Sequence, residues 1–150
     1  GIDGRSIGGW RLNSLHVSTG VGDGTSPTAS VELYSPEGER TTEAATGDGP
    51  VHALFAALAR ATKTHLEIET YQVSSVTTGE DAQGQASLTA RFQNDDGRVE
   101  EVTGSATSTD ILEASALAWL DIVNRVHRRR TPELATDADA APAEVLTAIA

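Results

Sequence analysis

The stretches ASVELY, residues 29–34, and ASLTARF, residues 86–92, decide the fold class because both alternate apolar and polar residues. Alternation with a period of two is typical of a half-buried β-strand. Each stretch follows a similar segment, WRLNSLHVST at residues 10–19 and IETYQVSSVTT at residues 68–78. An internal repeat of this kind indicates a duplicated structural unit. We therefore predict two pairs of strands at equivalent places in the two halves of the chain.

Turn residues and return strands follow both stretches. Pro-Glu-Gly at residues 36–38 follows the first, and Asn-Asp-Asp-Gly at residues 94–97 follows the second, where Asp-Gly is a strong hairpin signal. Residues 40–45 and 98–106 are the predicted return strands, and a helix follows each of them. The predicted order is strand, strand, strand, helix, twice. This order predicts an α+β fold with two sheets that are covered by two helices.

The two predicted helices differ in the arrangement of their apolar residues. The first begins at Gly-Asp-Gly-Pro, residues 47–50, where Asp48 or Gly49 caps it and the proline suits the first turn. Its apolar residues recur at spacings of three and four, as expected of one buried face. The second begins at Ser-Thr-Asp, residues 108–110, with Glu113 in a capping-box-like position, and is apolar on more than one face. We expect such breadth to bury the second helix between a sheet and another surface, such as a partner subunit.

Length and charge narrow the classes of protein to which the chain can belong. A chain of 150 residues has the size of one ordinary domain. Its 11 Lys and Arg against 22 Asp and Glu give a formal net charge of -11, which repels phosphate and argues against nucleic-acid binding. No apolar run approaches the roughly 20 residues that a membrane span needs. The first residues do not resemble a signal peptide, so the expected location is cytoplasmic.

We expect one folded domain with a segment at either end. The domain is predicted at residues 10–130, with units at about 10–64 and 65–130. Residues 1–9 are a predicted flexible N-terminal segment. Residues 131–150 form an acidic tail rich in Ala, Asp and Pro, for which we predict disorder or weak helix. Because the chain starts at Gly and contains no Met, we expect a fragment of a longer polypeptide or a processed chain.

The residue patterns that catalysis or metal binding would need do not occur. The chain has no Cys, and its four His residues are scattered, without the spacing that brings two imidazoles to one metal. The one Gly-x-Ser-x-Gly match, at residues 4–8, lies in the predicted flexible segment and not in the strand-to-helix turn of a nucleophile elbow, and no Gly-rich nucleotide-binding pattern is present. We therefore predict no catalytic centre, no metal site and no cofactor in this chain.

Two Gly-rich joints between predicted elements are candidates for ligand binding. Residues 47–49 stand at a helix N-terminus, where free backbone N–H groups can hold a small carboxylate, although capping alone explains them equally well. Residues 79–84, Gly-Glu-Asp-Ala-Gln-Gly, form a predicted loop whose acidic residues can accept an ammonium group. Taken alone, this loop is also explained as an ordinary polar connection.

Five motifs occur together in an order that resembles one known family. They are GDGPVHAL at residues 47–54, YQV at 71–73, VTTGEDAQG at 76–84, STDILEAS at 108–115 and LDIVNR at 120–125. The chain resembles the C-terminal allosteric, leucine-binding and dimerisation domain of 2-isopropylmalate synthase, from about Trp10 to Arg125. The regulatory domain of citramalate synthase is related to this family.

The resemblance implies two βββα units with pseudo-twofold symmetry and a homodimer formed through this domain. It also implies leucine feedback on a TIM-barrel catalytic domain in the same or another chain, while this chain itself is not an enzyme. Carried over residue by residue, the effector-binding set comprises Gly47, Asp48, Gly49, Val51, His52, Ile68, Tyr71, Ser75, Asp81, Ala82 and Gly84. A leucine site needs donors for the carboxylate, acceptors for the ammonium group and an apolar wall, which Ile68 and Tyr71 can supply.

Several alternatives stay open at this point. The chain can be a stand-alone sensor or dimerisation module, or an isoleucine-sensing domain of a citramalate synthase, and homocitrate synthase relatives are a further option. His52 stands where the family often has a small residue, so the shape of the pocket and the identity of the amino acid are open. Residues 108–110 are the counterpart of residues 47–49 in the second unit and form either a second site or a structural cap.

Overall fold

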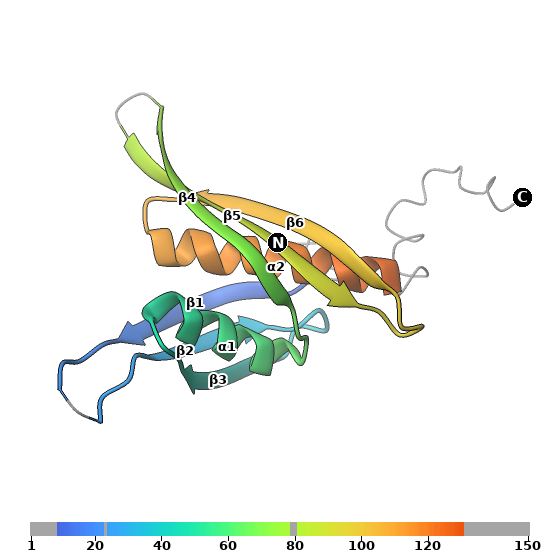
Figure 1. Ribbon diagram of the computed structural model, residues 1–150, viewed down its shortest axis with the longest axis horizontal. Coiled ribbons are helices and arrows are strands. Elements are labelled where there is room, and N and C mark those ends of the chain that lie inside the picture. Colours follow the sequence, from blue (N-terminus) through green and yellow to red (C-terminus); the bar gives the residue numbers. More distant parts are fainter. Residues whose placement is uncertain (1–8, 23, 79–80, 131–150) are drawn as a thin grey trace, which may run out of the picture.

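The computed structural model describes residues 9–22, 24–78 and 81–130. The predictions for residues 1–8 and 131–150 lie outside this part of the chain. Two three-stranded antiparallel sheets are present, and each is followed by one helix (Figure 1). The predicted α+β class and the duplicated order of three strands and a helix are confirmed.

The first unit runs from β1 (Arg11–Ser18) through β2 (Thr28–Tyr34) and β3 (Arg40–Thr46) to α1 (Pro50–Thr62). Its sheet has the order β1-β2-β3. The alternation in β2 explains this arrangement, because Ala29, Val31 and Leu33 share one face of the strand and are fully buried. Helix α1 packs on β2 and β3 with Leu54 and Leu58, which are also fully buried.

The second unit repeats this pattern with β4 (Glu67–Thr78), β5 (Asp81–Gln93), β6 (Val99–Ser108) and α2 (Ile111–Arg130). Its sheet has the order β4-β5-β6, and α2 packs on β5 and β6. The buried face of β5 carries Ala86, Leu88 and Ala90 at alternate positions. The middle strand of each sheet is therefore the one in which the sequence alternates most clearly.

The predicted loop over residues 79–84 is wrong for residues 81–84, which form the beginning of β5. Pairing of β4 with β5 continues to Thr78 opposite Asp81, so only two residues connect the strands. The composition of this segment indicates a loop, but pairing with β4 satisfies its backbone groups as a strand. The hairpin formed by β4 and β5 consequently projects beyond the rest of the molecule (Figure 1).

Helix α2 joins the two units into one core. Its own sheet lies on one side, and α2 also contacts α1 and β1 of the first unit. Trp119, Ile122 and Val123 are each no more than 1% exposed and belong to a single hydrophobic cluster that includes residues of both sheets. The sequence predicts that this helix is apolar on more than one face. Contacts within the chain explain this, because its own sheet covers one side of the helix and the first unit covers another.

Gly104 allows α2 to lie close to β6. A Cβ atom added there would be 2.6 Å from the Ala118 carbonyl oxygen and 2.7 Å from Ile122 Cγ1. The same helix covers the outer edge of β6, because the Ser105 N–H donates to Asp121 Oδ2 (3.3 Å). An edge strand whose backbone groups are occupied in this way is less able to pair with another chain.

The contact at Gly104 predicts that Gly104→Ala destabilises the protein. The methyl group meets backbone and buried side-chain atoms that cannot move independently, so we expect a loss of about 1–3 kcal/mol in the free energy of unfolding. Urea denaturation measures this loss. Gly20→Ala is the matched control, because its added Cβ would make only an ordinary contact, 3.5 Å from Thr25 Cβ, and Gly20 has no positive φ. Equal stability of the two variants would contradict the close packing of α2 on β6.

Candidate functional site

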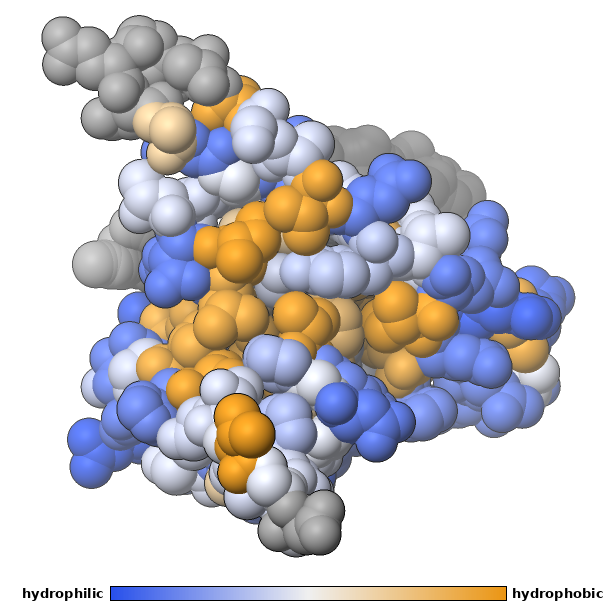
Figure 2. All heavy atoms as spheres, turned by 60° about the vertical axis from the view of Figure 1, so that its left-hand side comes forward, coloured by the Kyte–Doolittle hydropathy of each residue, from blue (hydrophilic) through white to orange (hydrophobic). Residues whose placement is uncertain are grey.

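A cavity of about 750 Å³ lies between α1 and the beginning of β4. Its walls are α1, the end of β3, the α1–β4 connection, the first part of β4 and one residue of α2. The lining residues are Ala45, Thr46, Val51, His52, Phe55, Ala56, Ala59, Arg60, His65, Leu66, Ile68, Tyr71 and Trp119. Figure 2 shows hydrophobic side chains gathered in a band across the middle of one face, with hydrophilic side chains on both sides. The cavity has the size and the mostly apolar lining of a small-molecule site.

Aromatic side chains fix the shape of this cavity. The rings of Phe55 and Tyr71 meet edge to face, with centroids 5.7 Å apart and planes at 87°. The Tyr71 hydroxyl is 2.7 Å from Ser115 Oγ, and Ser115 Oγ–H donates to the Ile111 carbonyl oxygen (2.8 Å). Because the serine hydrogen is used in this bond, the tyrosine is the donor to Ser115. Tyr71 is therefore held at both its ring and its hydroxyl.

The N-terminus of α1 offers unsatisfied backbone donors next to the cavity. Gly49 is the N-cap and provides no side-chain acceptor, and Pro50 has no N–H. The first intrahelical donor is Ala53 N–H, which bonds to the Gly49 carbonyl oxygen (2.9 Å). The N–H groups of Val51 and His52 precede it and have no intrahelical acceptor. These two groups and the positive end of the helix dipole favour a carboxylate at this position.

The N-terminus of α2 is capped by its own side chains instead. Asp110 Oδ1 accepts from the N–H of Leu112 (2.8 Å) and of Glu113 (3.4 Å). Ser108 Oγ also bonds to the Glu113 carboxylate. An internal carboxylate therefore occupies the position that is uncapped in α1, which makes the two units different in chemistry although they are similar in fold.

His52 and Asp48 lie at the end of the cavity near the α1 N-terminus. The Asp48 N–H donates to His52 Nδ1 (3.1 Å), so this ring nitrogen carries no proton and acts as the acceptor. The Asp48 carboxylate is 3.9 Å from the same nitrogen and is fully exposed. It is therefore free to turn toward a cationic group at the mouth of the cavity.

Seven of the eleven predicted effector residues lie at or next to the cavity. Val51, His52, Ile68 and Tyr71 line the cavity. Gly47, Asp48 and Gly49 immediately precede α1, next to Thr46 in its lining.

Ser75, Ala82 and Gly84 do not line the cavity but lie further along the β4–β5 hairpin. Ser75 is four pairs beyond Tyr71 in the register, on the same face and opposite Gly84. A Cβ at Gly84 would be 2.9 Å from Ile111 Cδ1, so this face is directed toward the α2 N-terminus. The backbone of Asp81 belongs to β5, and its side chain lies outside the described part of the structure.

Sequence reasoning missed most of the lining residues, among them Phe55, Ala56, Ala59 and Trp119. The first three follow His52 at helical spacings of three, four and seven, which place them on one face of α1. This spacing is visible in the sequence and could have identified them. Trp119 comes from the other unit, so its position depends on how the two units pack.

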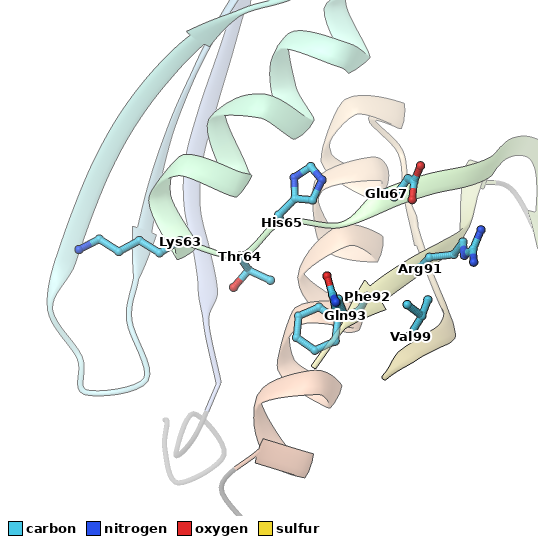
Figure 3. Close-up of a pocket in the computed structure, with 8 residues that line it drawn as sticks. All are labelled: Lys63, Thr64, His65, Glu67, Arg91, Phe92, Gln93 and Val99. Atoms are coloured by element: carbon cyan, nitrogen blue, oxygen red, sulfur yellow. The ribbon is translucent and has the colours of Figure 1, made fainter. Parts of the chain in front are cut away.

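A second cavity, of about 510 Å³, lies at the opposite end of α1 (Figure 3). Its lining consists of Lys63, Thr64, His65, Glu67, Arg91, Phe92, Gln93 and Val99. Figure 3 shows Lys63 directed away from Arg91, so these two cations do not converge on one point. Polar and charged side chains dominate this lining, in which Phe92 and Val99 are the two apolar residues, whereas the first cavity has a mostly apolar lining. We therefore place the candidate site in the first cavity.

Comparison with known proteins identifies the family of this chain. The profile of the LeuA allosteric (dimerisation) domain matches residues 3–127. The chain belongs to the LeuA allosteric (dimerisation) domain family. This LeuA domain is 51% identical over 122 residues to the 2-isopropylmalate synthase of Xanthomonas axonopodis pv. citri (strain 306), and the match covers 81% of the chain. It is 45% identical over 141 residues to the 2-isopropylmalate synthase of Stenotrophomonas maltophilia (strain R551-3), with 93% of the chain covered.

The LeuA domain spans about a quarter or less of these relatives, 22% of the Xanthomonas protein and 25% of the Stenotrophomonas protein. Within the described residues, no group of three or more His, Asp or Glu side chains could hold a metal ion. No helix in the described ranges is long and apolar enough to cross a membrane.

A carboxylate pair on the second sheet makes stability depend on pH. Hydrogen bonding to Glu101, together with burial and repulsion, raises the pKa of Glu69, although Arg91 Nε lies 3.5 Å from its carboxylate. A raised carboxyl pKa stabilises the folded protein at low pH, and this stabilisation is lost as the pH rises through the folded pKa. At neutral pH the two carboxylates repel each other.

We therefore expect Glu101→Gln to raise the melting temperature at pH 7, by about 1–2 °C for such an exposed pair. The gain should disappear near pH 3.5, below the ordinary glutamate pKa of about 4.3. Calorimetry at the two pH values measures the difference, with Glu37→Gln in the β2–β3 turn as the control. An equal effect at both pH values would show that Glu69 and Glu101 are not coupled.

Proposed function

We propose that this LeuA domain binds a branched-chain amino acid, with leucine as the first choice, and serves as the feedback-sensing part of a 2-isopropylmalate synthase. The observation that carries the proposal is the apolar cavity beside the uncapped N-terminus of α1. An amino acid needs donors for a carboxylate next to space for its side chain. The relatives named 2-isopropylmalate synthase support the choice of enzyme.

Each part of leucine has a group in the cavity that suits it. The N–H groups of Val51 and His52 would bind the carboxylate at the helix N-terminus. The isobutyl group would pack against Phe55, Ile68 and Tyr71, which bury it from water. The exposed Asp48 carboxylate would face the ammonium group. Ser75, Ala82 and Gly84 remain part of the proposed site as the face of the hairpin that continues from Tyr71, and Asp81 remains part of it as the neighbour of Ala82 in β5.

One ligand per chain follows from the difference between the two helix N-termini. Asp110 already accepts from the donors at the start of α2, so a carboxylate ligand would have to displace it. We therefore propose that residues 108–110 act as a structural cap and that the amino acid binds only at the N-terminus of α1.

We propose two partners for the LeuA domain, a second copy of the chain and a TIM-barrel catalytic domain. The family is described as a dimerisation domain, which supports a homodimer. The relatives' greater length is consistent with a catalytic part elsewhere in the same polypeptide. In this proposal leucine binding lowers the activity of that part, and the LeuA domain itself performs no catalysis.

Isothermal titration with leucine, isoleucine, valine and lysine tests the proposal. We expect leucine to bind with a stoichiometry of one per chain and to bind more tightly than the others. Tightest binding of isoleucine would favour a sensor of the citramalate synthase type. This alternative stays open because His52 stands where the family often has a small residue and alters the cavity near the ligand's carboxylate end. Absence of binding for all four amino acids would overturn the sensing function.

A cavity-filling substitution locates the site. Ala56 lines the cavity from α1, so Ala56→Phe would occupy the space of the leucine side chain and weaken binding by about tenfold or more. Ala44→Phe is the matched control, because Ala44 is exposed on β3. Unchanged affinity in Ala56→Phe, with the fold verified by circular dichroism, would place the ligand outside this cavity.

A further inference from the structure

The side chain of Asn124 on α2 holds the main chain of Trp10, just before β1. The Trp10 N–H donates to Asn124 Oδ1 (2.7 Å), and Asn124 Nδ2 donates to the Trp10 carbonyl oxygen (3.1 Å). These residues are 114 positions apart in the sequence. The asparagine amide therefore bonds to both backbone groups of one residue, as a neighbouring β-strand would.

The surroundings of this contact leave little space for independent movement. A Cβ atom added at Gly9 would be 3.4 Å from Asn124 Nδ2. Trp10 is half-buried and packs against the hydrophobic cluster, and its Nε1–H is buried without an acceptor among the described residues. A buried donor without an acceptor costs free energy. Because no hydrogen bond among the described residues fixes this ring, small shifts of the neighbouring helix change its environment.

The same helix forms part of the cavity wall at a distance from Asn124. Ser115 accepts the hydrogen bond of Tyr71, and Trp119 lines the cavity. Asn124 follows Ser115 by nine residues, or about 14 Å along a helix axis. Helix α2 therefore contacts the cavity near one end and the residue that leads into β1 nearer the other.

We infer that α2 transmits the filling of the cavity to the polypeptide at Trp10, and that Asn124 is the positioning residue of this route. A ligand that packs on Tyr71 and Trp119 favours one position of α2 over others, and this difference in affinity is what allostery requires. Displacement of α2 carries Asn124 with it and moves the Trp10 main chain through two hydrogen bonds. The identity of the natural ligand in this inference rests on the proposed function.

The two tryptophans of the chain permit a direct test, because Trp119 lines the cavity and the main chain of Trp10 is bonded to Asn124. Labelling with 5-fluorotryptophan gives one ¹⁹F resonance for each, assigned with Trp10→Phe and Trp119→Phe. We expect leucine to shift both resonances in the unsubstituted chain. In Asn124→Leu, which keeps the side-chain volume without hydrogen bonds, leucine should still shift Trp119. The Trp10 response should be largely lost.

Thr42→Ala, a change at an exposed position on β3, is the control and should leave both responses intact. Thermal unfolding followed by circular dichroism verifies that Asn124→Leu is folded. A Trp10 response in folded Asn124→Leu that equals that of the unsubstituted chain would overturn the inference. So would a Trp119 shift without any Trp10 shift in the unsubstituted chain.

A second arm tests the route without ligand. Tyr71→Phe removes the hydrogen bond to Ser115 at the cavity end of α2, and we expect it to shift the Trp10 resonance only when Asn124 is present. If leucine shifts neither tryptophan resonance, the proposed function fails. The Tyr71→Phe experiment still tests the inference, because it needs no ligand. An unchanged Trp10 resonance in Tyr71→Phe would then overturn it.

Discussion

Helix α2 is buried on two sides, by its own sheet and by α1 and β1 of the first unit, and this packing holds the two units in one core. It depends on a glycine at position 104, where the helix approaches β6 too closely for a side chain. Asp121 of the same helix accepts a hydrogen bond from the Ser105 N–H at the edge of β6, and Trp119 of this helix lines the cavity. The geometry of the candidate site therefore depends on a contact between the units.

Duplication gave the LeuA domain two helix N-termini in similar places, yet only one of them is free. In the second unit Asp110 supplies a carboxylate from within the chain. In the first unit Gly49 supplies none, and an apolar cavity adjoins the free donors. An internal cap adds stability to a helix, whereas an uncapped end beside a cavity is suited to an external carboxylate. The asymmetry is a physical reason for one ligand in a molecule with two similar halves.

The fold could be predicted from the sequence because its signals are local. Alternation in residues 29–34 and 86–92 defines the middle strands, and Asp110 marks the start of α2. The length of the β4–β5 hairpin could not be predicted in this way, since residues 81–84 have loop composition and become strand only by pairing with β4. The site shows the same division. Val51 and Tyr71 belong to recognisable motifs, whereas Trp119 belongs to none of them and lines the cavity because α2 packs against α1, which local patterns do not encode.

A crystal structure of the LeuA domain grown with leucine tests the central claim most directly. The account predicts one leucine per chain, with its carboxylate on the N–H groups of Val51 and His52 and its side chain against Phe55 and Tyr71. Leucine bound at the N-terminus of α2, in the polar cavity around Arg91 or at another surface, with the α1 cavity empty, would contradict it.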